Sequence, residues 1–114
     1  MPMAPWNEAA KRPPKGIPMI VLAGPSHPGR VLKDLYLDPL NMSAGALAGR
    51  IEVSSAVLVH LVKGELAMTA DTAVRLARFF GNTDEYWMNL QRDYDLHHAR
   101  RRVVVTRITP LKGE

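Results

Sequence analysis

Apolar residues recur at helical spacing along much of the chain, and the clearest pattern, between residues 43 and 64, predicts two short helices folded against each other across a tight turn. Their apolar positions are Leu47, Ile51, Val53, Leu58 and Leu61. Ser43 and Ser54 suit the N-cap positions, because a serine hydroxyl can accept a hydrogen bond from an unpaired N–H group of the first turn. Gly64 suits the position after the second helix, where a left-handed backbone is common. This spacing is typical of a helix-turn-helix, whose second helix enters the major groove of DNA.

Prolines dominate the region before this pattern. Six of them interrupt residues 1–26, namely Pro2, Pro5, Pro13, Pro14, Pro18 and Pro25. Proline fixes φ and removes a hydrogen-bond donor, so we predict an extended arm whose apolar patch is residues 17–22. A first helix then begins near His27 and ends at Asp38-Pro39, because the residue before a proline disfavours the helical conformation.

Two more helices are predicted after the helix-turn-helix. One runs from its N-cap, Thr69, to Gly81, with an i,i+4 ion pair between Asp71 and Arg75. Thr83 caps a longer helix that has acidic residues in its first turn and basic residues at its end, which complements the helix dipole. The apolar and aromatic stripe of this last helix comprises Tyr86, Trp87, Leu90, Tyr94 and His97.

The run V-V-V-T-R-I at residues 103–108 predicts a short strand. A lone strand leaves its backbone groups unpaired, and a second copy of the chain is the simplest source of a partner. The expected organisation is therefore an extended arm over residues 1–26, a helix-turn-helix domain over 27–101, and a C-terminal strand and tail over 102–114. The fold class is all-α.

Composition limits the number of domains, the location and the classes of partner that are expected. The 114 residues suit one domain, and 46% hydrophobic with 23% charged residues is ordinary for a globular protein. No run approaches the roughly 20 apolar residues of a membrane span, and no signal-peptide pattern is present, so a cytoplasmic protein is expected. The absence of cysteine excludes disulfides and thiolate metal sites. A net charge of +4 is a modest indication of a nucleic-acid partner.

Catalysis and metal binding have little support. The serines of the helix-turn-helix occupy cap positions, and neither a carboxylate pair nor a glycine-rich phosphate loop is evident. Asp93 and His97 share a helix face, but the adjacent His98 points about 100° away and no third ligand lies nearby in the sequence. We therefore expect no enzyme, no cofactor and no metal.

Three blocks of sequence carry a family resemblance. They are H-P-G-R-V-L at 27–32, T-A-D-T-A-V-R-L-A-R-F-F-G at 69–81, and W-M-N-L-Q-R-D-Y-D-L at 87–96. In this order and spacing they resemble the HigA antitoxins, which belong to the phage-repressor and Cro-like group. The resemblance implies a five-helix, lambda-repressor-like homodimer. It would neutralise HigB, a small basic toxin that cleaves mRNA, and repress its own operon by binding a palindromic operator.

The resemblance also implies a set of DNA contacts. The candidate residues are Ser43, Arg50, Ser54, Ser55, Val57, His60 and Lys63. Ser54 and Lys63 are expected at phosphates, Ser55 and His60 at base edges or phosphates, and Arg50 at a phosphate. The alternative interpretation is that these residues are helix caps and solvated surface.

Several residues depart from the family pattern. Ala44 replaces a polar residue that approaches a phosphate, and Glu65-Leu66 replaces a Lys-Arg pair. Glu52 stands where the turn usually has glycine, which would cost on the order of 1 kcal/mol if φ is positive there. The outward face of the second helix, within residues 55–60, is apolar, so it has few groups for base hydrogen bonds and retains contact with thymine methyl groups. We expect backbone charge to supply most of the DNA affinity.

Interfaces with proteins are expected in two further regions. The candidate dimer contacts are Tyr94, Val103, Val105 and Arg107. The candidate toxin contacts are Trp6, Ile17, Ile20 and Leu22 on the arm, and Arg30 and Lys33 on the first helix. Two alternative functions remain open: a protein-interaction module that neutralises a toxin without sequence-specific DNA binding, and a stand-alone transcriptional regulator.

Overall fold

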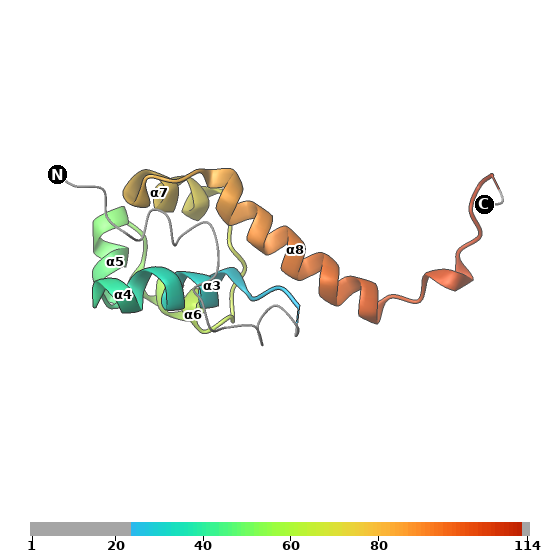
Figure 1. Cartoon of the computed structure of the whole chain (residues 1–114), viewed down its shortest axis with the longest axis horizontal. Helices are drawn as coiled ribbons and strands as arrows, with labels where there is room; N and C mark the ends of the chain where they lie inside the picture. The colour runs from blue at the N-terminus through green and yellow to red at the C-terminus, as the bar shows by residue number, and fades with distance from the viewer. Residues whose placement is uncertain (1–23, 113–114) are drawn as a thin grey trace.

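The computed structural model describes residues 24–112, and its regular elements are all helical (Figure 1). They are α3 (Pro28–Val31), the π-helical turn η1 (Leu32–Leu37), α4 (Asp38–Leu40), α5 (Ala44–Ile51), α6 (Ser55–Val62), α7 (Ala70–Phe80), α8 (Asp84–Arg102) and the 3-10 turn η2 (Val105–Arg107). Because α3, η1 and α4 are continuous, the described residues contain the predicted five helical segments and the all-α fold is confirmed. Apart from residues 24–26, the predicted arm lies outside the described residues.

The first helical segment does not end at Asp38-Pro39, as predicted, but continues to Leu40. A wide turn makes this continuation compatible with proline. The Asp38 N–H donates to the carbonyl of Lys33, five residues back, so the backbone is already π-helical where the proline ring enters. The segment ends at Asn41, which has a left-handed backbone with φ 55°.

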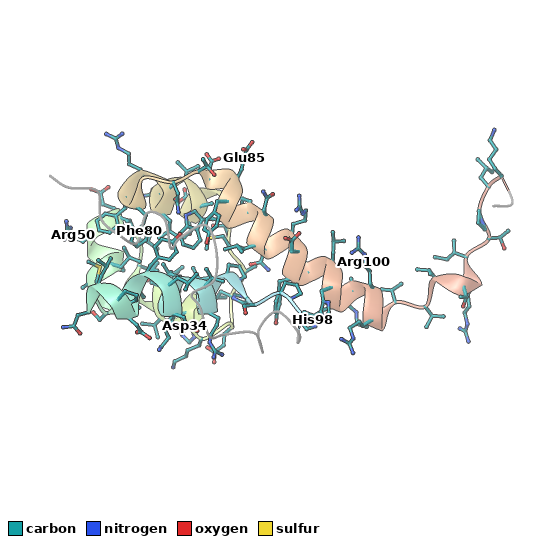
Figure 2. All side chains as sticks on the ribbon, in the orientation of Figure 1. Asp34, Arg50, Phe80, Glu85, His98 and Arg100 are labelled. Carbon is teal, nitrogen blue, oxygen red and sulfur yellow. The ribbon has the colours of Figure 1, made fainter. Side chains whose placement is uncertain are left out.

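The core lies among α3, η1, α5, α6, α7 and the first turns of α8. Its largest fully buried side chains are Trp87, Tyr36, Phe80, Leu32, Leu47, Leu58, Leu61, Leu76 and Pro28. Phe80 points inward among these helices (Figure 2). The ring centroids of Tyr36 lie 4.6 Å from Phe80 and 4.9 Å from Trp87, so the aromatic residues of three segments meet at one point.

One polar side chain connects this aromatic cluster to the loop before α8. The Asn82 amide donates to the Tyr36 hydroxyl at 3.0 Å and accepts from the Trp87 indole N–H at 3.0 Å. Burial raises the pKa of the Tyr36 phenol far above its usual value, so this hydroxyl stays protonated. The buried polar groups are thus paired, which the apolar surroundings require.

The C-terminal half of α8 leaves the body of the protein and projects away from it (Figure 1). The strand predicted over residues 103–108 is wrong: Val103 and Val104 are extended, but η2 follows and no ladder forms within the described residues. A β-branched run needs a neighbouring strand to pair with, and the single chain supplies none there. Val104, Val105 and Ile108 are accordingly exposed. None of the helices in residues 24–112 is long and apolar enough to span a membrane.

Candidate nucleic-acid interface

The helices α5 and α6 form the predicted helix-turn-helix. Ser43 caps α5 as expected, because its hydroxyl accepts the Ala46 N–H at 3.0 Å. The helix buries Leu47, Ala48 and Ile51 against the core. Across the turn, the Val53 N–H donates to the Ala48 carbonyl at 2.9 Å, so the chain reverses close to the small Ala48 side chain.

The condition under which Glu52 would be costly in the turn is met. Glu52 has φ 61°, a left-handed conformation that favours glycine. Arg75 of α7 holds the turn from outside, because its Nη1 donates to the Ile51 carbonyl at 3.0 Å and to the Glu52 carbonyl at 3.2 Å. The Asp71 carboxylate accepts from Arg75 Nε at 2.6 Å, which confirms that predicted ion pair. The contact with the turn was not predicted, since the sequence does not show that α7 packs beside it.

The start of α6 differs in one respect from the prediction. Ser54 is the N-cap residue, but its side chain makes no capping hydrogen bond. Ser54 and Ser55 are both exposed, so their hydroxyls are open to solvent at the beginning of the helix. In a helix-turn-helix the first residues of the second helix meet the DNA, and this structure leaves them uncovered.

The two sides of α6 have different surroundings. Leu58 and Leu61 are buried and hold the helix on the core. The exposed residues of α6 and its flanks are Ser54, Ser55, Ala56, Val57, His60 and Lys63. Val57 is 37% exposed, which makes it the most accessible large apolar side chain of this helix. The structure thus brings five of the seven predicted DNA contacts together on one exposed helix.

His60 has a partner that the sequence analysis missed. Its Nδ1 lies 2.6 Å from Oε1 of Glu65, and both side chains are about half exposed. The hydrogen bond to His60 lowers the pKa of the Glu65 carboxyl. Gly64, with φ 80°, reverses the chain and carries Glu65 back over the last turn of α6. Glycine just after a helix is the sequence signal that could have indicated this contact.

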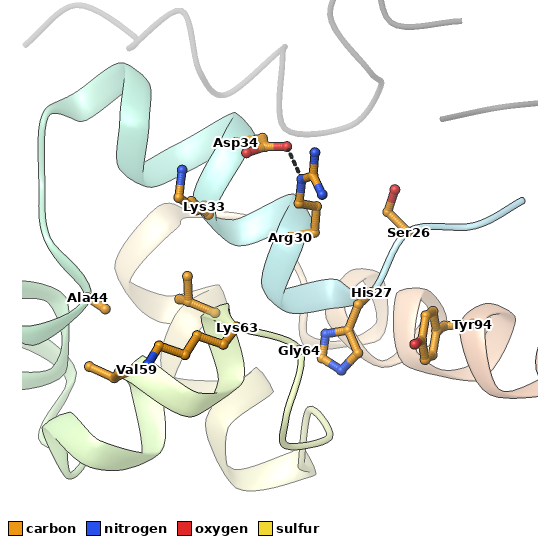
Figure 3. A pocket seen from close by; sticks show the side chains of 11 residues that line it. Ser26, His27, Arg30, Lys33, Asp34, Ala44, Val59, Lys63, Gly64 and Tyr94 are labelled. Atoms are coloured by element: carbon orange, nitrogen blue, oxygen red, sulfur yellow. Dashed lines mark hydrogen bonds and ion pairs between the residues drawn. The ribbon is translucent and has the colours of Figure 1, made fainter. Parts of the chain in front are cut away.

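An open groove of about 730 Å³ runs beside α6 between the first helical segment and the start of α5 (Figure 3). Arg30, Lys33, Ala44 and Lys63 are among its lining residues. Arg30 pairs with Asp34 at 2.7 Å and Lys33 with Asp38 at 3.0 Å. Two residues predicted for the toxin surface, Arg30 and Lys33, therefore share a groove with Lys63, which is predicted for DNA.

Arg50 lies apart from this groove, at the other end of α5 (Figure 2). Its guanidinium carbon is 5.2 Å from the centroid of the Phe79 ring, a distance at which cation–π attraction operates. Arg50 also lines a hollow that includes Arg75 and Arg78. A second basic region thus flanks the helix-turn-helix on the α7 side.

The predicted dimer contacts lie on the projecting part of the molecule. Tyr94 is half-buried between two rings, with centroid distances of 4.9 Å to His27 and 4.4 Å to His98. Val103, Val105 and Arg107 are exposed. The arm residues predicted for the toxin, Trp6, Ile17, Ile20 and Leu22, lie outside the described residues.

Within residues 24–112, no three His, Asp or Glu side chains are arranged to hold a metal ion.

Comparison with known proteins identifies the family. No family model matches the chain. The chain is 43% identical over 75 residues to virulence-associated protein I of Dichelobacter nodosus, covering 66% of this chain and 69% of that protein. It is 36% identical over 74 residues to antitoxin HigA-1 of Vibrio cholerae, covering 65% of this chain and 70% of the relative. The chain belongs to the HigA antitoxin family.

Solved structures confirm the fold of this HigA-family chain. A Pseudomonas aeruginosa protein in complex with its 18-base-pair operator DNA matches with a TM-score of 0.72 and 36% identity, covering 76% of this chain and 97% of that one. The P. aeruginosa antitoxin HigA with the higBA promoter matches with a TM-score of 0.67 and 37% identity, covering 68% and 85%. The predicted helix-turn-helix fold and family are therefore confirmed.

Proposed function

We propose that this HigA-family chain is the antitoxin of a HigBA-type pair and represses its own operon by binding operator DNA as a homodimer. The observation that carries the proposal is the exposed α6, held by a helix-turn-helix whose fold matches HigA with the higBA promoter. A helix fixed on the core by Leu58 and Leu61 can enter a major groove without rearrangement. This role places the chain in the cytoplasm with its operator.

The DNA contacts divide by chemistry. Ser54 and Lys63 bind phosphates at either end of α6, and Ser43 and Arg50 bind phosphates along α5. Ser55 and His60 meet base edges, and the methyl groups of Val57 meet thymine. Exposure of α6 supports this arrangement. Because few of these side chains form base hydrogen bonds, phosphate contacts supply most of the affinity.

The groove beside α6 offers Arg30 and Lys33 a second possible partner besides the toxin. Both residues line the groove that also contains Lys63, and both sit beside acidic partners on the surface. A phosphate backbone passing Lys63 would run along the same groove. These two cations are therefore additional candidates for phosphate contact, and the toxin surface is this face of the first helix or the arm, with Trp6, Ile17, Ile20 and Leu22.

The homodimer is built through the end of α8 and the residues after it. Val103 and Val105 are exposed, at 47% and 62%, and they follow the projecting end of α8. A second copy would cover these side chains, and with them Tyr94 and Arg107. Two-fold symmetry then places two copies of α6 for two half-sites of a palindromic operator.

A mobility shift with the DNA upstream of the chain's own gene tests repression. A retarded band at low salt that weakens steeply as salt rises is expected. Co-expression with the neighbouring small basic open reading frame tests neutralisation, and rescue of growth is expected. Deleting residues 1–23 should reduce toxin affinity and leave operator binding in place. No band at low salt with folded dimer present would overturn the repressor role.

A second function is favoured by the weak base-reading chemistry of α6. Val57 is exposed on α6, and Glu65 places a carboxylate beside His60 at the end of that helix, so a protein-interaction module without specific DNA binding is the competing interpretation. Rescue of growth with no promoter binding would select that module. Operator binding with no toxin partner would select a stand-alone regulator.

A further inference from the structure

The contact between His60 and Glu65 is built by the end of α6. The Gly64 N–H donates to the Leu61 carbonyl at 2.9 Å, and the Glu65 N–H donates to the His60 carbonyl at 2.9 Å. These two bonds fix the backbone of Glu65 over the last helical turn. The 2.6 Å contact between the two side chains therefore follows from the way the helix ends.

A carboxylate constrains the imidazole that it contacts. An ionised Glu65 can only accept hydrogen bonds, so the nitrogen facing it, Nδ1, must carry a proton. In a neutral imidazole the other nitrogen then carries the lone pair. Nε2 of His60 is thus left as a hydrogen-bond acceptor on the exposed side of α6.

The position of this acceptor, Nε2 of His60, on α6 suits contact with a base. His60 is exposed and lies four residues, about one turn, after the exposed Ala56, so the two share a face of α6. Ala56 and Val57 offer only methyl groups for reading bases. The ring of His60 is therefore a principal source of hydrogen-bond information on this helix.

We propose that Glu65 holds His60 in the Nδ1-protonated form, so that Nε2 accepts a hydrogen bond from an exocyclic amino group in the major groove. This inference rests on the proposed operator binding. Adenine and cytosine present such an amino group there, whereas guanine and thymine present acceptors to the same nitrogen. The pair is a specificity determinant that selects adenine or cytosine over guanine or thymine on the contacted strand.

The first test needs no DNA. Imidazole nitrogen chemical shifts of the full chain, measured on the neutral form of the ring at alkaline pH, should show His60 with Nδ1 protonated and Nε2 unprotonated. Glu65→Gln is a matched variant, because the amide keeps the size but can donate as well as accept. It should give a mixture of the two tautomers. A wild-type ring protonated at Nε2 would overturn the proposal.

The second test uses the upstream DNA with one base pair exchanged at a time in a half-site. One position should favour adenine or cytosine on one strand by about fivefold, the value of a single hydrogen bond. Replacing adenine there by purine, which lacks the amino group, should remove the preference. Glu65→Gln should reduce it below about twofold while preferences at other positions persist, and His60→Ala should abolish it.

The possible outcomes distinguish a failure of the role of Glu65 from a failure of operator binding. A preference unchanged in Glu65→Gln would overturn the role of Glu65 and leave operator binding intact. A chain that binds no DNA would overturn the proposed function and, with it, the base reading. The tautomer measurement would still report whether Glu65 orients the ring.

Discussion

The guanidinium of Arg75 donates to the carbonyl oxygen of Ile51 at 3.0 Å and so ties α7 to the end of α5. Ile51 is the last residue of α5, where carbonyl groups lack partners within the helix. The same side chain reaches Glu52 at 3.2 Å and is itself oriented by Asp71. One arginine therefore helps to fix the angle at which α6 leaves the turn.

Replacing Arg75 by methionine keeps the length of the side chain and removes its hydrogen bonds. We expect the free energy of unfolding to fall by about 1–3 kcal/mol, because carbonyl groups at the turn lose a charged donor. Operator affinity should fall as well, since the orientation of α6 loosens. Urea unfolding measures the first effect. Arg78→Met on the same helix is the control, and an equal loss in that variant would argue against a specific role for Arg75.

Glu52 and Asn41 allow the strain of a left-handed backbone at a non-glycine residue to be measured. Both are non-glycine residues with positive φ, at 61° and 55°. Glu52→Gly should raise the free energy of unfolding by about 1 kcal/mol, because it removes the left-handed penalty. Asn41→Gly should give a smaller gain, since asparagine tolerates this conformation. Thermal unfolding of the two variants provides the comparison, and a loss of stability in Glu52→Gly would contradict the strain.

Local chemistry explains which elements were predictable. Ser43, Thr69 and Thr83 each accept a hydrogen bond from the N–H three residues later, so the signal for each helix start lies within one turn of sequence. The predicted helix end at Asp38-Pro39 was wrong because the π-helical turn before Pro39 accommodates the proline ring. The strand failed for the opposite reason, because β-branched residues form a strand only where a partner is available.

The features of the candidate site also divide into those that local sequence predicts and those that depend on contacts between distant residues. Exposure of α6 followed from its apolar spacing, because Leu58 and Leu61 determine which face is buried. The hydrogen bond from Arg75 to the Ile51 carbonyl joins residues 24 positions apart, and no periodic pattern predicts such a contact. The groove beside α6 also combines distant segments, so the sequence did not show that Arg30 and Lys63 lie in one groove.

The two serines of the helix-turn-helix are both proposed DNA contacts, but they should differ in their effect on stability. Ser43→Ala removes a 3.0 Å capping hydrogen bond to Ala46. It should lower the free energy of unfolding by about 1 kcal/mol. Ser54→Ala removes no such bond and should leave stability nearly unchanged while weakening operator binding. Chemical unfolding and mobility shifts on both variants check this, and equal losses of stability would be evidence against it.

His27 should make stability depend on pH. Its Nδ1 accepts the Gly29 N–H at 2.9 Å, and burial, the largest influence, lowers the pKa of His27 below 6.5 despite the opposing charge of Asp95. The unfolded state therefore binds more protons in this range, so stability should fall as pH drops below 6.5 through the folded pKa. His27→Asn keeps a side-chain acceptor without a charge change. Thermal unfolding between pH 7 and pH 5 should show a smaller decline in this variant than in the wild type.

Val57 should read thymine through its methyl groups. It is 37% exposed on α6, and the C5 methyl of thymine is the apolar feature of the major groove. Replacing the contacted thymine by deoxyuridine removes one methyl group and should weaken binding about fourfold, the value of one buried carbon. Val57→Ala should weaken binding to the thymine operator and make it insensitive to deoxyuridine.

A valine elsewhere on the surface provides the matched control for this experiment. Val74 on α7 is 54% exposed, and Val74→Ala should leave both the affinity and the sensitivity to deoxyuridine unchanged. If Val57→Ala retained the full preference for thymine, the methyl contact would have to come from another residue of α6. Ala56 is then the residue to exchange, because glycine at that position removes its only methyl group while leaving Val57 in place.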